Sequence, residues 1–262
     1  MTRRERPRVP SDKKAILFPM PRNARQQINT PFTIRPAVPE DTPALSRICL
    51  LTGDAGQSAE SLHRHGELPG FVWVLPYVLL PSETARTWGF VLVDDAASND
   101  VHTTETIKGY IVGTSDTRAY EATTKAEWWP PLRIRYPLSS NGDERIKADQ
   151  DCIDTIHRGP DVALEACLAV SPAHMHVNLL PEVQGRGWGR RLVGRVVEHL
   201  RGQDVNAVWL GMDERNTAAR KFYERIGFQE IKGAPSNLMA LDFETWKGVE
   251  GARGDQPGKP IH

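Results

Sequence analysis

The sequence predicts an α/β domain. Short runs rich in β-branched and aromatic residues alternate along the chain with segments of helical periodicity, the order expected of a sheet covered by helices. Two of these runs, Trp88–Val93 and Ile107–Gly113, flank a polar stretch and indicate a hairpin. At residues 178–195, an apolar run leads through a glycine-rich turn directly into an amphipathic helix.

The remaining elements are placed by the same patterns. Besides the hairpin, strands are expected at Phe32–Ala37, Met175–Leu180, Ala207–Met212, Phe228–Ile231 and Leu238–Phe243. Helices are expected at Pro39–Leu51, residues 58–66, Thr117–Trp129 (closed by Pro130 and Pro131), Asp151–His157, Asp161–Val170 and Thr217–Ile226, with Gly227 as the last stop. The apolar residues 69–81 carry no assignment.

Composition and charge narrow the classes of function. The 262 residues are 39% hydrophobic and 25% charged with a formal net charge of zero, which is ordinary for a globular chain and gives no overall attraction for nucleic acid. No apolar run approaches the ~18 residues that a membrane span needs, so no membrane association is expected. The three cysteines form no C-x-x-C pair, which argues against a disulfide scaffold or zinc site. A reducing, cytoplasmic compartment is expected; a nuclear location and a homodimer stay open.

The chain divides into three regions. Residues 1–30 are basic and proline-rich and are expected to form a tail, although an apolar patch inside them could be pinned on the domain. The α/β domain is expected at residues 31–246, and residues 247–262 are rich in glycine and proline and are expected to be a second tail. The N-terminal region lacks an apolar core, so no secretory signal is expected.

The glycine-rich turn has the composition of an anion-binding site. Glycines leave backbone N–H groups unhindered, and a helix N-terminus adds unpaired donors and the positive end of its dipole. Arginines add formal positive charge. A pyrophosphate is therefore expected at the turn made of Gln184, Gly185, Arg186, Gly187, Trp188 and Gly189, with Arg190 and Arg191 after it.

Two nucleotide motifs share such turns but do not fit this one. A triphosphate P-loop would continue with Gly-Lys-Ser/Thr, and a dinucleotide fingerprint needs G-x-G-x-x-G, whereas Gly185, Gly187 and Gly189 give G-x-G-x-G. The pattern Gln-x-x-Gly-x-Gly, which begins at Gln184, resembles instead the coenzyme A pyrophosphate loop of the GNAT superfamily of acetyltransferases. Downstream, Asn216–Phe228 is similar to the N-x-x-A-x-x-F-Y-x-x-x-G-F element that closes the cofactor site in these enzymes.

Further segments resemble one subgroup, the bacterial and fungal acetyltransferases related to the C-terminal acetyltransferase-like domain of O-GlcNAcase. These segments are Ile34–Ala37, Thr52–Gln57, Asp116–Glu121, Ala126–Leu132, Ile156–His157 and Pro172–Pro181. The resemblance runs from about Phe32 to about Phe243. It implies a GNAT fold, with a mixed central sheet of about six or seven strands, helices on both faces of the sheet and a splay at the cofactor strand. It also implies direct transfer of acetyl from acetyl-CoA to an amine without a metal.

The resemblance also assigns roles to individual residues. Tyr223 would be the general acid that protonates the leaving thiolate, with a packed helix aromatic as its alternative role. Asn216 would bond the pantetheine arm, cap its helix, or do both. The residues expected around coenzyme A are Leu179, Leu180, Val183, Gln184, Gly185, Arg186, Gly187, Trp188, Gly189, Arg190, Asn216, Phe222 and Tyr223.

The acceptor amine must lose a proton, so a base or a water relay is also expected. Asp54 and Asp116 are the catalytic candidates, each with a turn or capping role as the alternative; Glu182, His174 and His176 are further candidates. His174, His176 and Asn178 alternate and therefore share one face of a strand, as a polar ladder or a pocket wall, and no metal site is expected. The expected acceptor contacts are Asp54, Asp116, Trp128, Trp129, His176 and Asn178, with core packing as the alternative for both tryptophans.

Three functions are open at this point. The first is an N-acetyltransferase for the primary amine of a small molecule, with an amino sugar such as glucosamine as the preferred acceptor. The second is a protein or histone lysine acetyltransferase, which predicts an open acidic groove. The third is a non-catalytic acyl-CoA-binding domain, which predicts cofactor binding without turnover.

Overall fold

The computed structural model describes residues 32–95, 106–138 and 146–249. The expected tail at residues 1–30, the end of the second tail from residue 250, and most of the hairpin turn lie outside the described residues. Among the described residues, none of the helices is both long and apolar enough to cross a bilayer.

One seven-stranded sheet organises the described residues, with strand order β1-β2-β3-β4-β5-β7-β6. Every neighbouring pair is antiparallel except β4 with β5, which are parallel. The strands are β1 (Phe32–Pro36), β2 (Thr87–Asp94), β3 (Thr106–Thr114), β4 (His174–Leu179), β5 (Ala207–Gly211), β6 (Gln229–Glu230) and β7 (Leu238–Asp242). The predicted α/β class, the mixed sheet and the hairpin of β2 with β3 are confirmed.

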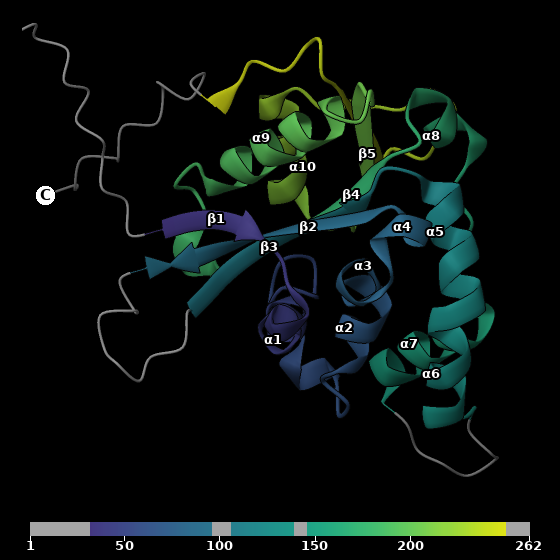
Figure 1. Ribbon diagram of the computed structural model, residues 1–262. Coiled ribbons are helices and arrows are strands. Elements are labelled where there is room, and N and C mark those ends of the chain that lie inside the picture. The colour runs from purple at the N-terminus through teal and green to yellow at the C-terminus, as the bar shows by residue number, and fades with distance from the viewer. Residues whose placement is uncertain (1–31, 96–105, 139–145, 250–262) are drawn as a thin grey trace, which may run out of the picture. The chain divides into compact units, whose positions relative to one another are not determined.

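Helices cover both faces of the sheet (Figure 1). One face carries α9 (Trp188–Arg201) and α10 (Thr217–Ile226), and the other carries α1 (Thr42–Leu51), α2 (Leu68–Trp73) and α3 (Pro76–Leu79). The remaining helices are α4 (Ser82–Ala85), α5 (Thr117–Thr123), α6 (Trp129–Arg135), α7 (Lys147–Arg158) and α8 (Glu165–Val170).

Side-chain alternation along the strands gives each face its own core. Ile111 and Met175 pack with the apolar side of α9 and α10, whereas Tyr110 and Val112 pack with α1 and α3. All four side chains are at most 1% exposed, so a one-residue slip of β3 or β4 would exchange the two cores. The register of β4, and with it the direction of its polar side chains, is therefore firmly fixed.

Four local expectations need correction. Pro130 and Pro131 do not close the helix that begins at Thr117, because a π-helical turn at Thr124–Trp128 is followed at once by α6, whose first turn contains both prolines. Residues 58–66 contain only the 3-10 turn Glu60–Leu62. The unassigned apolar residues 69–81 supply most of α2 and all of α3. Helix α7 begins at Lys147, four residues before its expected start at Asp151.

Candidate active site

The site begins where β4 and β5 diverge. These strands pair at one position, His174 opposite Trp209, where the Trp209 N–H donates to the Ala173 carbonyl at 3.1 Å. On its other edge β4 remains paired with β3 throughout, and the Leu180 N–H beyond its end still donates to the Lys108 carbonyl at 2.9 Å. A wedge-shaped gap therefore opens between two neighbouring strands of one sheet, and the predicted splay is confirmed.

The gap exposes an unpaired edge of β4. Because hydrogen bonds alternate along an antiparallel pair, the N–H groups of His176 and Asn178 face β3, and the peptide groups of Val177 and Leu179 face the gap. The Gln184 side chain occupies one of these positions, since its Nε2 donates to the Leu179 carbonyl at 2.8 Å. The Val177 peptide group and the Leu179 N–H are left to pair with an extended ligand.

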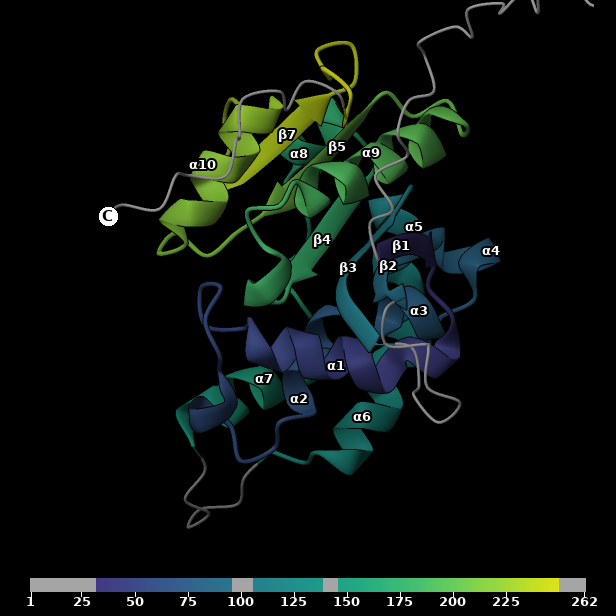
Figure 2. The same ribbon diagram turned by 90° about the vertical axis from the view of Figure 1, so that its left-hand side faces the viewer.

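A cavity of about 960 Å³ fills the gap and reaches both faces of the sheet. On the α9 side it is lined by Gly187 and Gly189 and by one side of α10 that includes Tyr223. On the α1 side it is lined by Thr52 and the loop that follows α1. Figure 2 shows α10 and α1 on opposite sides of β4, so a ligand in the cavity would meet both layers of helices.

The three glycines of the predicted anion site do different jobs. Gly185 and Gly187 have φ of +69° and +81°, and a Cβ at either position would have no atom within 4 Å, so it is backbone conformation that requires glycine there. At Gly189 a Cβ would lie 2.8 Å from the Phe222 ring, so this glycine lets α9 approach α10. Gly187 caps α9, and the unpaired N–H groups of that helix open toward the cavity.

Some residues around this turn line the cavity, and others lie outside its lining. Arg190 lines the cavity while its Nε donates to the Gly248 carbonyl at 2.7 Å and its guanidinium stacks on Trp246. Trp188 is buried against Phe32 and does not line the cavity. Leu180, Val183 and Arg186 also lie outside the lining, whereas Leu179, Gln184, Gly185, Gly187, Gly189, Asn216, Phe222 and Tyr223 belong to it.

Helix α10 contributes the groups that could act on a bound thioester. Tyr223 is 7% exposed and packs against Phe222 and Phe228. Burial raises the pKa of Tyr223, so its phenol keeps its proton at neutral pH. Its hydroxyl has no hydrogen-bond partner among the described residues and is free to donate into the cavity. Asn216 caps α10, with its Oδ1 accepting from the Ala219 N–H at 3.0 Å.

Polar side chains of β4 line or approach the α1 side of the gap. Asn178 lines the cavity, and its Nδ2 donates to the Thr52 hydroxyl. His176 is partly buried two residues earlier on the same face of the strand, with its Nε2 3.1 Å from the Tyr77 hydroxyl. Burial lowers the pKa of His176 to about 4, so the imidazole is neutral at physiological pH.

Asp54 reaches the cavity from the loop after α1, but it is not a free carboxylate. Its Oδ1 lies 2.9 Å from Nη2 of Arg215, which also pairs with Asp213 at 2.7 Å. The cavity lining as described contains the cations Arg190, Arg215 and Arg225 and this one carboxylate. The electrostatic character of the cleft is therefore cationic, as an anionic ligand would require.

Comparison with known proteins identifies this architecture. A model of the acetyltransferase (GNAT) family matches residues 152–228, which include the splay, α9 and α10. The chain matches a crystal structure of SsHAT with 33% sequence identity and a TM-score of 0.67, and the match covers 80% of this chain and 96% of the SsHAT chain. The chain belongs to the GNAT acetyltransferase family.

Two curated GNAT relatives match different lengths of the chain. The O-GlcNAcase of Rattus norvegicus is 22% identical over 213 residues, or 80% of this chain and 22% of that protein. The ribosomal protein bS18-alanine N-acetyltransferase of Haemophilus influenzae is 39% identical over 56 residues, or 21% of this chain and 38% of that protein. The chain thus spans between 22% and 38% of the length of these relatives. The predicted resemblance to GNAT enzymes and to O-GlcNAcase is confirmed.

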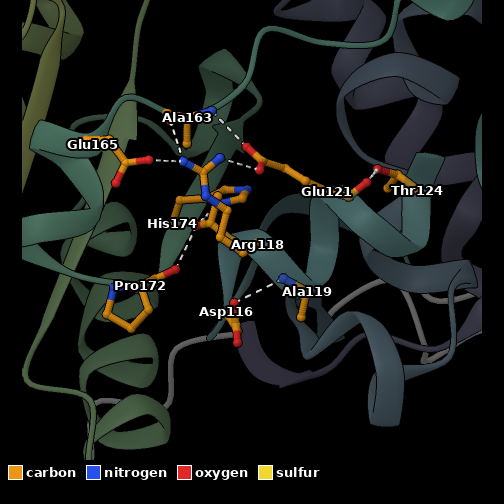
Figure 3. A network of polar contacts seen from close by, with 10 residues as sticks. Asp116, Arg118, Ala119, Glu121, Thr124, Ala163, Glu165, Pro172 and His174 are labelled. Atoms are coloured by element: carbon orange, nitrogen blue, oxygen red, sulfur yellow. Dashed lines mark hydrogen bonds and ion pairs between the residues drawn. The ribbon is translucent and has the colours of Figure 1, made fainter. Parts of the chain in front are cut away.

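Several residues expected at the GNAT acceptor site lie elsewhere. The Asp116 carboxylate accepts from the Ala119 N–H at 3.0 Å and so caps α5 (Figure 3). Asp116 does not belong to the cavity lining. Trp129 is 2% exposed in the core beside α7, and Trp128 Nε1 donates to the Phe71 carbonyl at 2.9 Å. Both tryptophans take the packing role, because the helix that carries them lies away from the splay.

Sequence reasoning missed three contributors to the site. Thr52, Tyr77 and Arg215 contact the predicted residues Asn178, His176 and Asp54, respectively. Thr52 lies inside a segment that resembles the subgroup, so its role could have been found there. Tyr77 comes from the apolar stretch without an assignment and meets β4 only in the folded chain.

Proposed function

We propose that this acetyltransferase transfers the acetyl group of acetyl-CoA directly to the primary amine of a small molecule, with an amino sugar such as glucosamine as the preferred acceptor. Acetyl-CoA supplies an activated thioester whose carbonyl carbon accepts the amine. The observation that carries the proposal is the cavity between β4 and β5, which joins the N-terminus of α9 to the polar face of β4. An amine entering from the α1 side would meet a thioester held from the α9 side.

The described residues fit coenzyme A at both ends of its pantetheine arm. The Val177 peptide group and the Leu179 N–H would pair with the amides of the arm as a strand neighbour does. The N–H groups at the start of α9, with Arg190 beside them, would hold the pyrophosphate. Asn216 already uses its Oδ1 as a helix cap, so only its Nδ2 is left for the ligand.

Tyr223 would complete the transfer on the cofactor side. When the amine nitrogen attacks, the C–S bond breaks and the sulfur needs a proton. The Tyr223 phenol is protonated, lacks a partner among the described residues and lines the same cavity. This favours a catalytic domain over one that only binds acyl-CoA.

The charges around the cavity favour a small acceptor over a lysine-rich peptide. A cationic peptide would need acidic groups at the entrance, whereas the described lining carries three arginines and an aspartate already paired with Arg215. The Haemophilus influenzae relative is named for acetylating an alanine of a ribosomal protein, so an amine nitrogen is a supported class of acceptor. The amino sugar is the finer part of the proposal and rests on the likeness to O-GlcNAcase.

A thiol-release assay tests the proposal. The full chain is incubated with acetyl-CoA and a panel of amino sugars, polyamines, amino acids and histone peptides, and free coenzyme A is followed. Release with glucosamine, and much less with histone peptides, is expected. Gly187→Glu serves as the control, because a carboxylate at the start of α9 should abolish cofactor binding. Binding of acetyl-CoA without release for any amine would contradict an enzymatic function.

A further inference from the structure

A chain of hydrogen bonds begins at His176 and runs into the protein; His176 lies outside the cavity lining, two residues before Asn178 on the same face of β4. Nε2 of His176 lies 3.1 Å from the Tyr77 hydroxyl, which lies 2.7 Å from Nε2 of His174. Nδ1 of His174 lies 2.7 Å from the Thr117 hydroxyl, which donates to the Pro172 carbonyl at 2.6 Å. Figure 3 shows the inner end of this chain, where His174 and Pro172 lie beside the start of α5.

The inner end fixes the direction of every bond in the chain. A carbonyl oxygen can only accept, so the single proton of Thr117 is committed to Pro172. Thr117 must then accept from Nδ1 of His174, and this uses the proton of the neutral imidazole. Burial lowers the pKa of His174 well below its usual value, so its Nε2 carries no proton and accepts from Tyr77. With its own proton committed to His174, Tyr77 accepts from Nε2 of His176, and the neighbouring Tyr120 hydroxyl, which also interacts with Tyr77, can then only donate to it.

At its outer end, the hydrogen-bond chain leaves one lone pair of the His176 ring unused. Because the proton of neutral His176 is on Nε2, its Nδ1 is unprotonated. This Nδ1 has no hydrogen-bond partner among the described residues, and it is not one of their fully buried unsatisfied atoms, so part of its surface is accessible although the ring is largely buried. A fixed tautomer with an unused lone pair meets the geometric requirement of a general base. The pKa of about 4 makes the free ring a weak base, so proton uptake must accompany formation of the C–N bond.

The residues next to His176 on this face are small, exposed or part of the cavity lining. On the same face of the sheet, β5 carries Trp209 beside His174, but two residues further on it carries only Gly211. Trp73 stands 6.4 Å from the His176 ring with 47% of its surface exposed. Asn178, the next side chain on this face, lines the cavity itself. An acceptor that reaches past Asn178 along this face of β4 would bring its amine to His176, with Trp73 beside it.

We propose that His176 is the general base of acetyl transfer, acting through Nδ1, and that Tyr77, His174 and Thr117 are positioning residues that fix its tautomer. This inference rests on the proposed function, and it names the group on the acceptor side of that site. The two candidates for the base, Asp54 and Asp116, are then not needed in that role. Asp54 pairs with Arg215, and Asp116 caps α5.

The proton and electron balance is simple. The nitrogen lone pair of the neutral amine forms the C–N bond, the C–S bond breaks, and its electron pair leaves on sulfur. The amine proton passes to Nδ1 of His176, and the sulfur takes the phenolic proton of Tyr223. Solvent then removes the proton from His176 and returns one to Tyr223, so the net products are the amide and the free thiol.

The tautomer is tested first, by ¹⁵N NMR of the full chain labelled at histidine, at pH 7, with the His176 signals assigned by their loss in His176→Ala. The expected result is a protonated Nε2 and an unprotonated Nδ1, with this preference weakened in Tyr77→Phe. A protonated Nδ1 on His176 in the wild type would overturn the inference whatever the enzyme acetylates.

Kinetics then test the chemical role, with glucosamine or the best amine of the panel. His176→Ala should lower kcat about 10²-fold or more while acetyl-CoA affinity stays within threefold, and added imidazole should restore at least tenfold. His157→Ala, at a histidine bonded to the Tyr136 carbonyl, is the matched control and should keep full activity. Activity of His176→Ala within threefold of wild type, or a loss that imidazole does not restore, would overturn the inference alone. Transfer by the wild type to no amine at all would overturn the proposed function together with it.

Discussion

Along β4, odd-numbered side chains meet α9 and α10, whereas the polar side chains at even positions meet α1, α3 and α5. The first face is built from segments that follow one another closely, because the strand, the glycine turn and the two helices all lie between His174 and Ile226. The second face is assembled from distant segments: Tyr77 is 97 residues from His174, and Thr52 is 126 residues from Asn178. The cofactor half of the site is therefore a local structure and the acceptor half a tertiary one.

This difference matches the division of labour that we propose. Coenzyme A is the same ligand whichever amine is acetylated, and backbone N–H groups with a helix N-terminus can hold it with few specific side chains. An acceptor is recognised by the side chains around its amine, so its half of the site can change by exchanging helices on the α1 face. The following predictions separate the two halves.

The largest effect is expected at Tyr223, on the cofactor face. Tyr223→Phe keeps the packed ring but removes the proton donor, so kcat should fall about 10²-fold or more with the affinity for acetyl-CoA unchanged. Burial raises the pKa of Tyr223, so wild-type activity should show no loss of this acid up to the ordinary tyrosine range. Steady-state thiol release and calorimetric titration measure the two quantities. Tyr136→Phe, outside the cavity lining, should be neutral for turnover; equal turnover in wild type and Tyr223→Phe would remove Tyr223 as the acid.

Substituting two glycines by alanine can distinguish the effect of backbone strain on stability from the effect on coenzyme A binding. Gly187 and Gly159 have φ of +81° and +84°, and neither would bring a Cβ within 4 Å of another atom. Alanine should cost about 1–2 kcal/mol of unfolding free energy at Gly187, where ψ is −1° and the backbone is left-handed helical, and at least as much at Gly159, whose ψ of 160° is essentially confined to glycine. Only Gly187→Ala should also weaken coenzyme A binding, because only Gly187 lies at the start of α9. Equal coenzyme A affinity in both variants would argue against the turn as the pyrophosphate site.

The histidines of the acceptor face should make stability depend on pH. Burial lowers the pKa of His176 to about 4 and that of His174 well below its usual value, and the ionisable groups packed around them are Tyr77 and Tyr120. In the unfolded chain both imidazoles titrate near pH 6.5, so below that pH the unfolded state binds more protons and stability falls.

His176→Gln should reduce this dependence. Between pH 6.5 and about 4, the slope of unfolding free energy against pH should be smaller in the variant by up to about 1.4 kcal/mol per pH unit. Urea unfolding at a series of pH values measures it. Identical slopes in the two proteins would mean that His176 titrates normally in the folded state.

The smallest effect is expected at Asp116. Its carboxylate caps α5, so Asp116→Ala should lower the unfolding free energy by about 1 kcal/mol and leave thiol release unchanged. Asp116→Asn, which keeps a capping oxygen, should restore the stability. A tenfold loss of kcat in either variant at unchanged stability would return Asp116 to the active site.

The same contrast explains how much could be predicted from the sequence. All seven strands and the glycine turn were predictable, because their signals lie in short, contiguous segments. The splay followed from the family resemblance, which is carried by two such segments, Gln184–Gly189 and Asn216–Phe228. The roles of Asp116, Trp128 and Trp129 could not be read in this way, since a carboxylate suits a cap as well as a pocket and a tryptophan suits a core as well as a wall. Their positions depend on how α5 and α6 pack, and that is decided by residues far away in the chain.

The placement of coenzyme A between β4 and β5 can be tested most directly at the backbone amides of β4, some of which are hydrogen-bonded to β3 while others face the gap. Amide hydrogen exchange of the full chain is followed by NMR with and without coenzyme A. The amides of Val177 and Leu179, which face the gap, should become protected when coenzyme A is added, while that of Asn178, already paired with β3, should change little. Unchanged exchange at Val177 and Leu179 under saturating coenzyme A would contradict the placement of the cofactor between β4 and β5.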